Sequence, residues 1–394
     1  MTARPAIASA LLLSLGALAG GCTPTPRPAV PSEPGVLSGA VYHDRNGNGV
    51  RDRFDFGISG VAVSNGRDVV RTNRSGRYRL PLSGDAIVFV VKPRGFTTKV
   101  DAFGLPKNHY VHRPDGSPSD PKYPGVAATG PLPSSVDFPL TRQSESDRFE
   151  VLLFGDPQPY TAEQIDHLAR DVVAELIGSN AAFGITLGDI VGDDLTLFEP
   201  LNAVIGRIGI PWYNVPGNHD MNLGAPSDTD SLETFTRVYG PGTYAFQYAS
   251  THFVVFDDVV YGGALSDGQS AQNYVGGLDG DQLAFLRGYL FGVPRDELVV
   301  LAMHIPLAGP SPTLEVPERR ELFAILAGHP HNLSIASHTH TQEHHFLGSG
   351  APPPPDPGND LGKLVARHRR RGRHPPRDDA RRHTEWVFGP AHRR

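Results

Sequence analysis

The stretch from Phe149 to Phe346 contains five short polar clusters: Gly155-Asp156-Pro157-Gln158, Gly188-Asp189-Ile190-Val191-Gly192-Asp193, Gly217-Asn218-His219-Asp220, Met303-His304 and His338-Thr339-His340. Each cluster comes at the end of an apolar run. Asp, Asn and His are side chains that bind hard or borderline divalent metals in proteins. Their repetition at the ends of five apolar runs predicts a hydrolase that uses two metal ions.

Alternating strands and helices are predicted around these clusters. Apolar runs predict strands at Phe149–Phe154, Ala182–Leu187, Pro211–Val215, Thr251–Phe256, Leu298–Met303 and Leu333–Ala336. Apolar residues that recur at three and four positions predict helices at Glu163–Ile177, Asp281–Phe291 and Pro317–Leu326. The alternation predicts an α/β domain over residues 148–348, whose ligands bind beyond the carboxyl ends of its strands. All the polar clusters fall at such ends.

A small all-β sandwich is expected before this domain, over residues 36–105. Short alternating runs are broken there by Gly, Asn and Asp, and Asn65-Gly66 between two of them predicts a hairpin in which both residues have positive φ. Residues 23–35 are rich in Pro, Thr and Ser and are expected to form a linker. Residues 106–147 are rich in Pro, Ser and Asp and are expected to be a long connector.

One loop of the predicted β-sandwich has the spacing of a calcium site. Oxygen-bearing side chains stand at loop positions one, three, five, nine and twelve, with Gly49 at six: Asp44, Asn46, Asn48, Asp52 and Asp55. Asp55 stands where an EF-hand has a bidentate Glu, and its shorter side chain reaches less far. The alternative is a turn rich in Asx and Gly residues that needs no ion.

The first 22 residues have the pattern of an export signal. Arg4 precedes an apolar run from Ala6 to Leu18, which is too short to span a bilayer and ends in Ala19-Gly20-Gly21-Cys22. The segment resembles a bacterial lipoprotein signal peptide, which implies lipidation of Cys22 and a membrane anchor in the cell envelope. Ala19 stands where Leu is commoner, so ordinary secretion remains the alternative. Either way, we expect the protein to leave the cytoplasm.

Composition limits the other function classes. The chain has 394 residues, which leaves room for two or three domains, and its hydrophobic content of 39% fits a globular protein. Its formal net charge of -6 gives no case for binding nucleic acid by bulk electrostatics. Cys22 is the single cysteine, which excludes a disulfide framework and a thiolate zinc site.

The order and content of the five clusters resemble the calcineurin-like metallophosphoesterases. The resemblance covers about 200 residues, from Phe149 to Phe346. It implies two facing β-sheets flanked by helices (an αββα sandwich) with two metal ions, Mn, Fe or Zn, at one edge. The calcium-type loop also resembles calcium-dependent β-domains of bacterial surface proteins and the N-terminal domain of some secreted members of this family.

The resemblance also implies which residues bind the metals. It implies that Asp156 and His340 bind the first metal, that Asn218, His304 and His338 bind the second, and that Asp189 bridges the two. Gln158 departs from the family pattern, in which His is usual as a ligand of the first metal. A Gln carbonyl oxygen still coordinates, but it is a weaker and harder donor that favours Mn over Zn.

The resemblance gives His219 a role in catalysis rather than in metal binding. It implies that a metal-bridging hydroxide attacks the phosphorus, that His219 protonates the leaving oxygen, and that Asp220 fixes the tautomer of His219. Asp193 and Asp194 are expected to be structural, as helix caps or supports. His344 and His345 follow the metal-binding pair and are expected to lie in a solvated loop, with pocket lining as the alternative.

The composition changes after Gly350. Residues 349–394 include a proline run and ten arginines between Leu361 and Arg394. Three interpretations are open: a basic tail that binds anionic lipid or polyphosphate, a disordered segment, or an out-of-frame translation or sequencing error. We favour the third, because in family members with this N-terminal domain a further β-rich domain usually follows.

The leading hypothesis is an exported, metal-dependent phosphoesterase that hydrolyses a small phosphorylated substrate. The alternative is a cell-surface binding lipoprotein in which the phosphoesterase domain is inactive. Loss of a C-terminal domain and Gln158 in place of His favour the alternative somewhat. Phosphomonoesters, diesters and pyrophosphates share these ligands, so the sequence leaves the substrate and the oligomeric state open.

Overall fold

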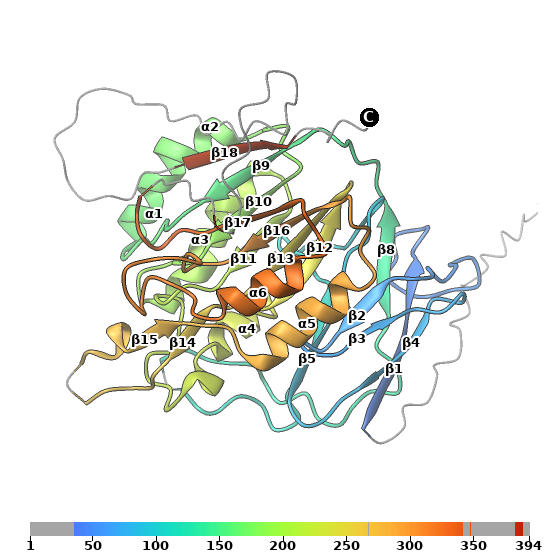
Figure 1. The fold of residues 1–394 in the computed structure, drawn as a ribbon, viewed down its shortest axis with the longest axis horizontal. Coiled ribbons are helices and arrows are strands. Elements are labelled where there is room, and N and C mark those ends of the chain that lie inside the picture. The colour runs from blue at the N-terminus through green and yellow to red at the C-terminus, as the bar shows by residue number, and fades with distance from the viewer. Residues whose placement is uncertain (1–34, 121, 267, 342–346, 348–382, 389–394) are drawn as a thin grey trace, which may run out of the picture.

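The computed structural model describes residues 35–120, 122–266, 268–341, 347 and 383–388. The described part combines an N-terminal β-sandwich with a larger α/β unit in which two sheets lie face to face, as Figure 1 shows. This architecture confirms the predicted fold class. Within the described ranges, no helix is both long enough and apolar enough to cross a bilayer. The predicted signal peptide and linker, residues 1–34, lie outside the described residues.

The N-terminal sandwich contains eight short strands: β1 (Val36–His43), β2 (Ala62–Ser64), β3 (Val69–Arg71), β4 (Arg77–Pro81), β5 (Ala86–Val90), β6 (Phe96–Thr97), β7 (His109–His112) and β8 (Phe138–Arg142). They form two sheets in the orders β4-β1-β8-β6 and β3-β2-β5-β7. Buried side chains such as Leu37, Val63, Leu80, Val88 and Leu140 fill the space between the sheets. The alternating runs of the sequence therefore form the predicted β-sandwich.

The structure corrects two expectations for this part. Residues 106–147 were expected to be a connector, but they include β7 and β8, and β8 pairs in parallel with β1. The predicted hairpin at Asn65-Gly66 joins β2 and β3, but only Gly66 has a positive φ, of 92°. The side-chain oxygen of Asn65 instead accepts hydrogen bonds from the backbone N–H groups of Arg67 and Asp68, which closes a wider turn.

The α/β unit contains two main sheets and a hairpin. The strands are β9 (Phe149–Phe154), β10 (Phe183–Leu187), β11 (Trp212–Val215), β12 (Tyr244–Tyr248), β13 (Thr251–Val255), β14 (Val259–Tyr261), β15 (Tyr274–Gly276), β16 (Leu298–Ala302) and β17 (Asn332–Ile335), with β18 (His383–Phe388) added at one edge. The sheets have the orders β11-β10-β9-β18 and β12-β13-β16-β17, and β14 pairs with β15. Strands β9, β10 and β11 are parallel, as are β13, β16 and β17.

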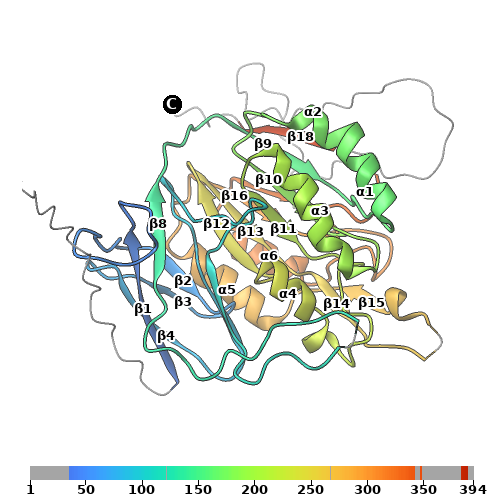
Figure 2. The ribbon, with the colours of Figure 1, turned by 180° about the vertical axis from the view of Figure 1, so that it is seen from behind.

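Helices cover both outer faces of the two sheets (Figures 1 and 2). They are α1 (Ala162–Leu168), α2 (Ala174–Leu176), α3 (Phe198–Ile205), α4 (Glu233–Tyr239), α5 (Gly280–Leu290) and α6 (Arg319–Leu326), with a π-helical turn between α1 and α2. Residues of α1, α3 and α4 pack with Leu152, Phe154 and Trp212 of the first sheet. Residues of α5 and α6 belong to the core cluster that contains the second sheet. The result is four layers, helices–sheet–sheet–helices.

The sequence predicted most of these elements. All six predicted strands are present, as β9, β10, β11, β13, β16 and β17, and the three predicted helices correspond to α1 with α2, α5 and α6. The sequence analysis missed α3, α4, β12 and the β14–β15 hairpin. Strand β12 was missed because Tyr244–Tyr248 has no long apolar run, yet three aromatic side chains anchor it in the core.

A buried ion pair joins the sandwich to the α/β unit. The Lys92 ammonium lies 2.6 Å from a carboxylate oxygen of Glu145, and both side chains are at most 5% exposed. Lys92 also donates to the backbone carbonyl of Gln247, and Glu145 accepts from the backbone N–H groups of Gly95 and Ala249. Burial lowers the pKa of Lys92, and Glu145 opposes that effect. The pair fastens residues of three separate chain segments to one another.

Of the predicted tail, the structure describes only residues 383–388. Residues 349–394 were expected to be disordered or out of frame, but His383–Phe388 form β18, which pairs antiparallel with β9. The backbone of these six residues therefore differs from the expectation of disorder. The rest of the tail, together with the predicted pocket candidates His344 and His345, lies outside the described residues.

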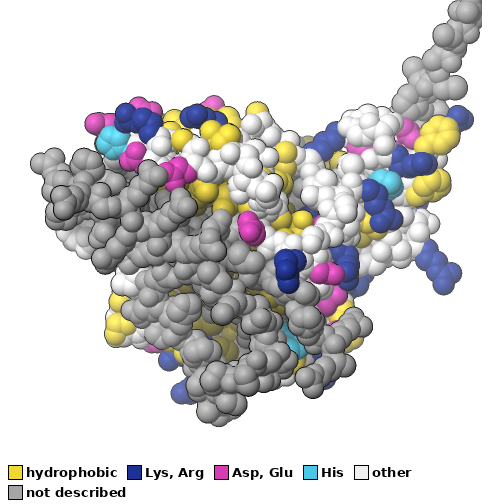
Figure 3. All heavy atoms as spheres, turned by 90° about the horizontal axis from the view of Figure 1, so that it is seen from above, with side chains coloured by type: hydrophobic (Ala, Val, Ile, Leu, Met, Phe, Trp, Pro, Cys, Tyr) yellow, Lys and Arg dark blue, Asp and Glu magenta, His cyan; other side chains and the backbone are white. Residues whose placement is uncertain are grey.

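The surface carries charges of both signs. On the face in Figure 3, the described Lys and Arg side chains are scattered among Asp and Glu side chains. Over the described side chains of that face, neither sign gathers into one large patch.

Candidate metal centre

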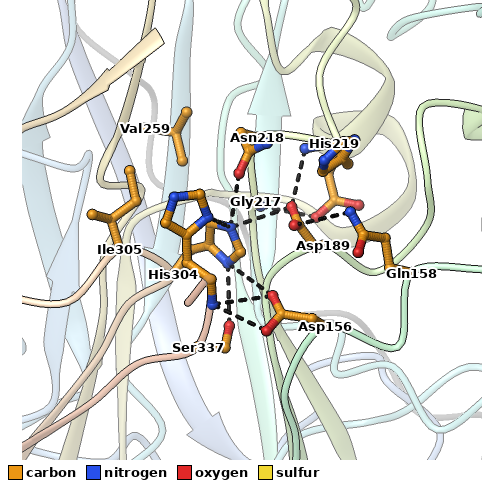
Figure 4. A network of polar contacts seen from close by, with 12 residues as sticks. Asp156, Gln158, Asp189, Gly217, Asn218, His219, Val259, His304, Ile305 and Ser337 are labelled. Carbon is orange, nitrogen blue, oxygen red and sulfur yellow. Dashed lines mark hydrogen bonds and ion pairs between the residues drawn. The ribbon is translucent and has the colours of Figure 1, made fainter. Parts of the chain in front are cut away.

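The five polar clusters meet at one edge of the two sheets. Asp156 and Gln158 follow β9, Asp189 follows β10, Asn218 and His219 follow β11, His304 follows β16, and His338 and His340 follow β17. Parallel strands end at the same edge of a sheet, and the two sheets face each other, so their carboxyl ends form one site. Figure 4 shows His304, Asn218 and Asp189 pointing towards one another, with Asp156 and Gln158 beside them.

The backbone at this edge is held in an unusual conformation. Among the described residues, seven non-glycine residues have positive φ, and six of them belong to the clusters: Asp156, Gln158, Asp189, Asp193, His338 and His340. Such positions cost about 1–3 kcal/mol each and persist where the surrounding structure imposes them. Gly188 has a φ of 87°, and a Cβ there would collide with the His304 ring. The unusual backbone conformation of these loops therefore sets the direction of the side chains in the polar clusters.

Two groups of donor atoms share one carboxylate. Asp189, His304 and His338 form one group, and Asp156, Asp189 and His340 form the other, with the donor atoms of each group within 4.8 Å of one another. Asp189 is 2% exposed and His304 is fully buried. The two oxygens of a carboxylate can face two cations about 3.5–4 Å apart. The structure thus brings together the predicted ligands of both metals, with Asp189 between them.

The hydrogen bonds of His304, which is buried, and His338, which is partly buried, support a cation site. His304 Nδ1 lies 2.9 Å from the Leu187 carbonyl oxygen, and His338 Nε2 lies 2.9 Å from that of Thr313. A carbonyl oxygen only accepts, so each of these ring nitrogens carries the proton when the ring is neutral. The other nitrogens, His304 Nε2 and His338 Nδ1, then present lone pairs to each other at 3.1 Å.

Two further oxygens face the same nitrogen of His304. Its Nε2 lies 3.0 Å from the side-chain oxygen of Asn218 and 3.3 Å from Asp189 Oδ1. Neutral imidazole nitrogens, an amide oxygen and a carboxylate that converge in this way are the donor set of a transition-metal site. The residues present therefore fit a divalent metal ion.

Asp156 is held by the loop that carries the opposite histidines. Both of its carboxylate oxygens accept from the His338 backbone N–H, at 3.1 and 3.0 Å. Burial raises the pKa of Asp156, His304 lowers it, and Asp189 raises it further. The net rise in the pKa of Asp156 follows mainly from burial, and the nearby charge of Asp189 adds to it. A bound cation would relieve the repulsion between the two carboxylates.

Gln158 lies at the edge of the centre. Its side-chain Nε2 is 3.3 Å from Asp189 Oδ2, and its backbone N–H donates to the Asp189 carbonyl at 2.9 Å. The amide oxygen and nitrogen exchange places on a flip of the side chain, so its oxygen can also point toward the centre. Its predicted role as a ligand stays a prediction.

The partner of His219 is Asp193, which corrects the sequence analysis. His219 Nδ1 lies 2.8 Å from Asp193 Oδ1. Burial lowers the pKa of His219, but the hydrogen bond with Asp193 and the charge of Asp189 outweigh it and raise the pKa to about 9. Asp193 was expected to be a helix cap or a support, and it acts as a support, but its contact with His219 was not predicted. It follows β10, far along the chain from His219. No pattern in the sequence indicated this pairing.

Asp220 has a different role from the predicted one. It is fully buried, and its oxygens accept from the backbone N–H groups of Ile190, Val191 and Gly217. Its carboxylate thus ties the loop after β10 to the loop after β11. Within the part of the chain that the structure describes, it forms no hydrogen bond with the His219 ring. Asp194 is a cap as predicted, since it accepts from the Thr196 backbone N–H.

Several residues that support the centre were not predicted. The Tyr274 hydroxyl lies 3.3 Å from His338 Nε2, and Ser337 lies 3.2 Å from His304 Nδ1. Asp258 is fully buried and accepts from the backbone N–H groups of His304 and Ile305. Two aspartates in a row, Asp257-Asp258 after β13, were the one sequence signal for this residue.

Comparisons with known proteins agree with this geometry. The family model of the calcineurin-like phosphoesterase matches residues 149–342, and the model of the N-terminal domain of calcineurin-like phosphoesterases matches residues 45–123. Together the two matches cover more than half of the chain. The comparison with curated proteins gives no match.

Two solved structures show a low likeness. A dimetal phosphatase from Danio rerio is 18% identical with a TM-score of 0.39, over 49% of this chain and 82% of that one. A double mutant of the shaft pilin SpaA from Lactobacillus rhamnosus GG is 13% identical with a TM-score of 0.16, over 30% of this chain and 52% of that one.

Proposed function

The chain belongs to the calcineurin-like phosphoesterases, and from this premise we propose that it is an enzyme that hydrolyses phosphate esters with two divalent metal ions. The observation that carries the proposal is the position of Asp189 in both groups of donor atoms. One carboxylate shared by two groups, each with its own histidine, is the arrangement that a two-metal hydrolase requires.

The proposed ligands follow from the two groups. Asp156 and His340 hold one ion, with Gln158 beside them, and His304, His338 and the Asn218 oxygen hold the other. The bound ions would polarise the phosphoryl oxygens and make water a better nucleophile. Family membership implies two divalent ions, and we propose Mn, Fe or Zn, with Mn favoured by the amide oxygen of Gln158.

We propose that His219 protonates the leaving oxygen of the substrate. Its ring is about 21% exposed, so it can reach a bound ester, and its backbone N–H donates to Asp189 Oδ1 at 3.0 Å. Asp193 holds Nδ1 and thereby keeps the proton-donating Nε2 directed away from the carboxylate. Tyr160 lies beside the ring, with the two ring centroids 6.2 Å apart. His219 is thus the catalytic residue, and Asp193 is a positioning residue.

Removal of metal is the direct test of the function. Treatment of the chain with EDTA will lower the hydrolysis of p-nitrophenyl phosphate or its bis-diester by at least about 10³-fold, because the Lewis-acid contribution of several kcal/mol is lost. Addition of Mn, Fe(II) or Zn to the dialysed protein will restore the rate. The rates are measured by p-nitrophenolate absorbance, and the ratio of monoester to diester rates gives the preferred class.

The outcome separates this function from the alternative of a binding lipoprotein with an inactive site. A chain that retains two metal ions by elemental analysis but turns over neither substrate with any of the three metals would favour the binding role. The complete donor set supports the enzyme, since an inactive site has no need of converging ligands. Export through residues 1–22, with lipidation of Cys22, remains part of the proposal on sequence grounds.

The pairing of His219 with Asp193 makes a second prediction. Asp193→Asn will lower kcat by roughly 10–100-fold, a part of the 10²–10⁴-fold that a general acid contributes. The loss will be larger for phenyl phosphate than for p-nitrophenyl phosphate, because the poorer leaving group depends more on a proton. The measurement is kcat for both esters with the unaltered chain, Asp193→Asn and His219→Asn.

Asp220→Asn is the matched comparison for that prediction. It removes a charged acceptor of three backbone N–H groups, so we expect a lower temperature of unfolding, with the ratio of the two ester rates unchanged. If Asp220→Asn, rather than Asp193→Asn, altered that ratio, the sequence-based role of Asp220 would be right and the pairing in the structure irrelevant to catalysis.

A further inference from the structure

We propose that the loop between β1 and β2 binds one calcium ion, at a site separate from the metal centre. The loop runs from Asp44 to Asp55 on the β-sandwich and takes no part in the proposed hydrolysis. Three of its carboxylates are almost completely buried: Asp44, Asp52 and Asp55, at 0, 2 and 1% exposure. Buried carboxylates are rare in proteins unless they are paired or bind a metal.

An unsatisfied oxygen of Asp44 is the observation that points to a ligand. Its Oδ2 accepts from the Gly49 backbone N–H at 2.7 Å, so the side chain reaches across the loop. Its Oδ1 is buried and has no hydrogen-bond partner among the described residues. A buried acceptor without a partner costs about 1–3 kcal/mol, and more when it is charged. A bound cation removes that cost.

The rest of the loop is shaped around this oxygen. Gly49 has a φ of 78°, which L side chains rarely adopt, and so permits the sharp turn that brings its N–H to Asp44. The oxygens of Asn46 and Asn48 each accept from the backbone N–H two residues further on. An amide oxygen has two lone pairs, so both Asn side chains keep acceptor capacity for a cation.

The two other carboxylates hold the loop in place. Asp55 accepts from the backbone N–H groups of Arg45 and Asp52, and Asp52 accepts from the Phe54 backbone and the Asn46 side chain. Both oxygens of Asp55 thus hold the loop backbone. The position of Asp55 in the loop had suggested instead that both oxygens bind the ion. Both carboxylates still add negative charge beside Asp44.

The chemistry of the loop selects calcium. All its candidate donors are oxygens, which suit hard cations, whereas a zinc site would need nitrogen or sulfur. Calcium accepts irregular spheres of carboxylate, amide and carbonyl oxygens, but magnesium demands near-octahedral geometry and keeps its water. The first loop residue, Asp44, also donates its backbone N–H to Leu140 of β8, so an occupied loop would stabilise the sandwich.

The test compares thermal unfolding of the full chain in EGTA and in about 2 mM calcium, a concentration suited to weak extracellular sites. Calcium will raise the unfolding temperature by about 4 °C or more, and magnesium at the same concentration will not. Asp44→Asn, which keeps the acceptor for Gly49, will lose the calcium-dependent rise. In EGTA it will unfold at the same or a higher temperature than the unaltered chain, since it lacks the unpaired buried charge.

Asp68→Asn is the control, because Asp68 is an exposed aspartate of the same sandwich and should keep the full rise. All these chains have the same metal centre, so any effect of calcium there is common to them. Titration calorimetry will show one calcium site fewer in Asp44→Asn than in the Asp68→Asn control. The proposal is overturned if the unaltered chain shows no rise with calcium, or if Asp44→Asn keeps the rise. Either result would leave the loop as a turn whose oxygen is met by water.

Discussion

Asp189→Asn will lower kcat/KM for phosphate ester hydrolysis by on the order of 10³-fold or more. The carboxylate of Asp189 is the one group shared by both donor sets, so its loss affects both ions. The contribution of a metal ion to stabilising transition-state charge is several kcal/mol, and about 1.4 kcal/mol corresponds to a tenfold change in rate. The measurement is kcat/KM with p-nitrophenyl phosphate in saturating Mn.

The substitution is designed to keep the shape of the site. Asparagine retains one oxygen, which can still accept from the His219 backbone N–H as Asp189 Oδ1 does. It removes the charge and places an amide near His304 Nε2, which lies 3.3 Å from the carboxylate. We therefore expect the bound metal to fall from two ions per chain toward one or none, while the chain stays folded.

Asp166→Asn is the matched control, because Asp166 is an exposed aspartate on α1 of the same domain. It should leave both rate and metal content unchanged. Retention of more than a tenth of the activity by Asp189→Asn, with two ions still bound, would show that Asp189 does not bridge the metals. The proposed function would then need another arrangement of ligands.

Glu145→Gln will destabilise the protein by about 3–5 kcal/mol, because it leaves the buried Lys92 ammonium without its partner. The pair lies at the joint between the sandwich and the α/β unit, away from the metal centre. We therefore expect the free energy of unfolding in urea to fall sharply, while kcat of the folded protein at low temperature stays the same.

The pH dependence of this loss has a definite sign. Burial lowers the pKa of Lys92 and Glu145 opposes it, so the pKa of Lys92 falls further in Glu145→Gln. The unfolded chain, in which lysine titrates near 10.5, then binds more protons than the folded one in the pH range between the lowered pKa of folded Lys92 and 10.5. The stability of the variant thus rises with pH, and its deficit relative to the unaltered chain is larger at pH 7 than at pH 9.5.

The control is the same substitution in an exposed ion pair. Glu163 lies 3.9 Å from His167 on α1, with both side chains more than half exposed, so Glu163→Gln should change the stability by less than about 1 kcal/mol. Equal effects of Glu145→Gln and Glu163→Gln would mean that the buried pair contributes nothing specific. A smaller deficit at pH 7 than at pH 9.5 would contradict the role assigned to Lys92.

The class of the site and the order of its ligands could be predicted from local sequence patterns. Asp156, Asp189, Asn218, His304 and His338 each follow a run that is apolar enough to be recognised as a buried strand. Carboxyl ends of parallel strands meet by geometry, so the gathering of these residues followed from local patterns alone. The calcium-type spacing from Asp44 to Asp55 was also readable, because its residues are neighbours in the chain.

The pairing of residues from distant segments could not be predicted from the sequence, because it depends on how the folded elements pack. His219 hydrogen bonds with Asp193 rather than with its neighbour Asp220, because the loops after β10 and β11 lie side by side and the backbone N–H groups of Ile190, Val191 and Gly217 occupy the oxygens of Asp220. The parallel pairing of β8 with β1 was missed for a similar reason. Parallel strands are not joined by a tight turn, so their pairing leaves no turn signal in the sequence. Periodicity records which face of an element is buried; it does not record which partner lies there, because that contact forms only when the chain has folded.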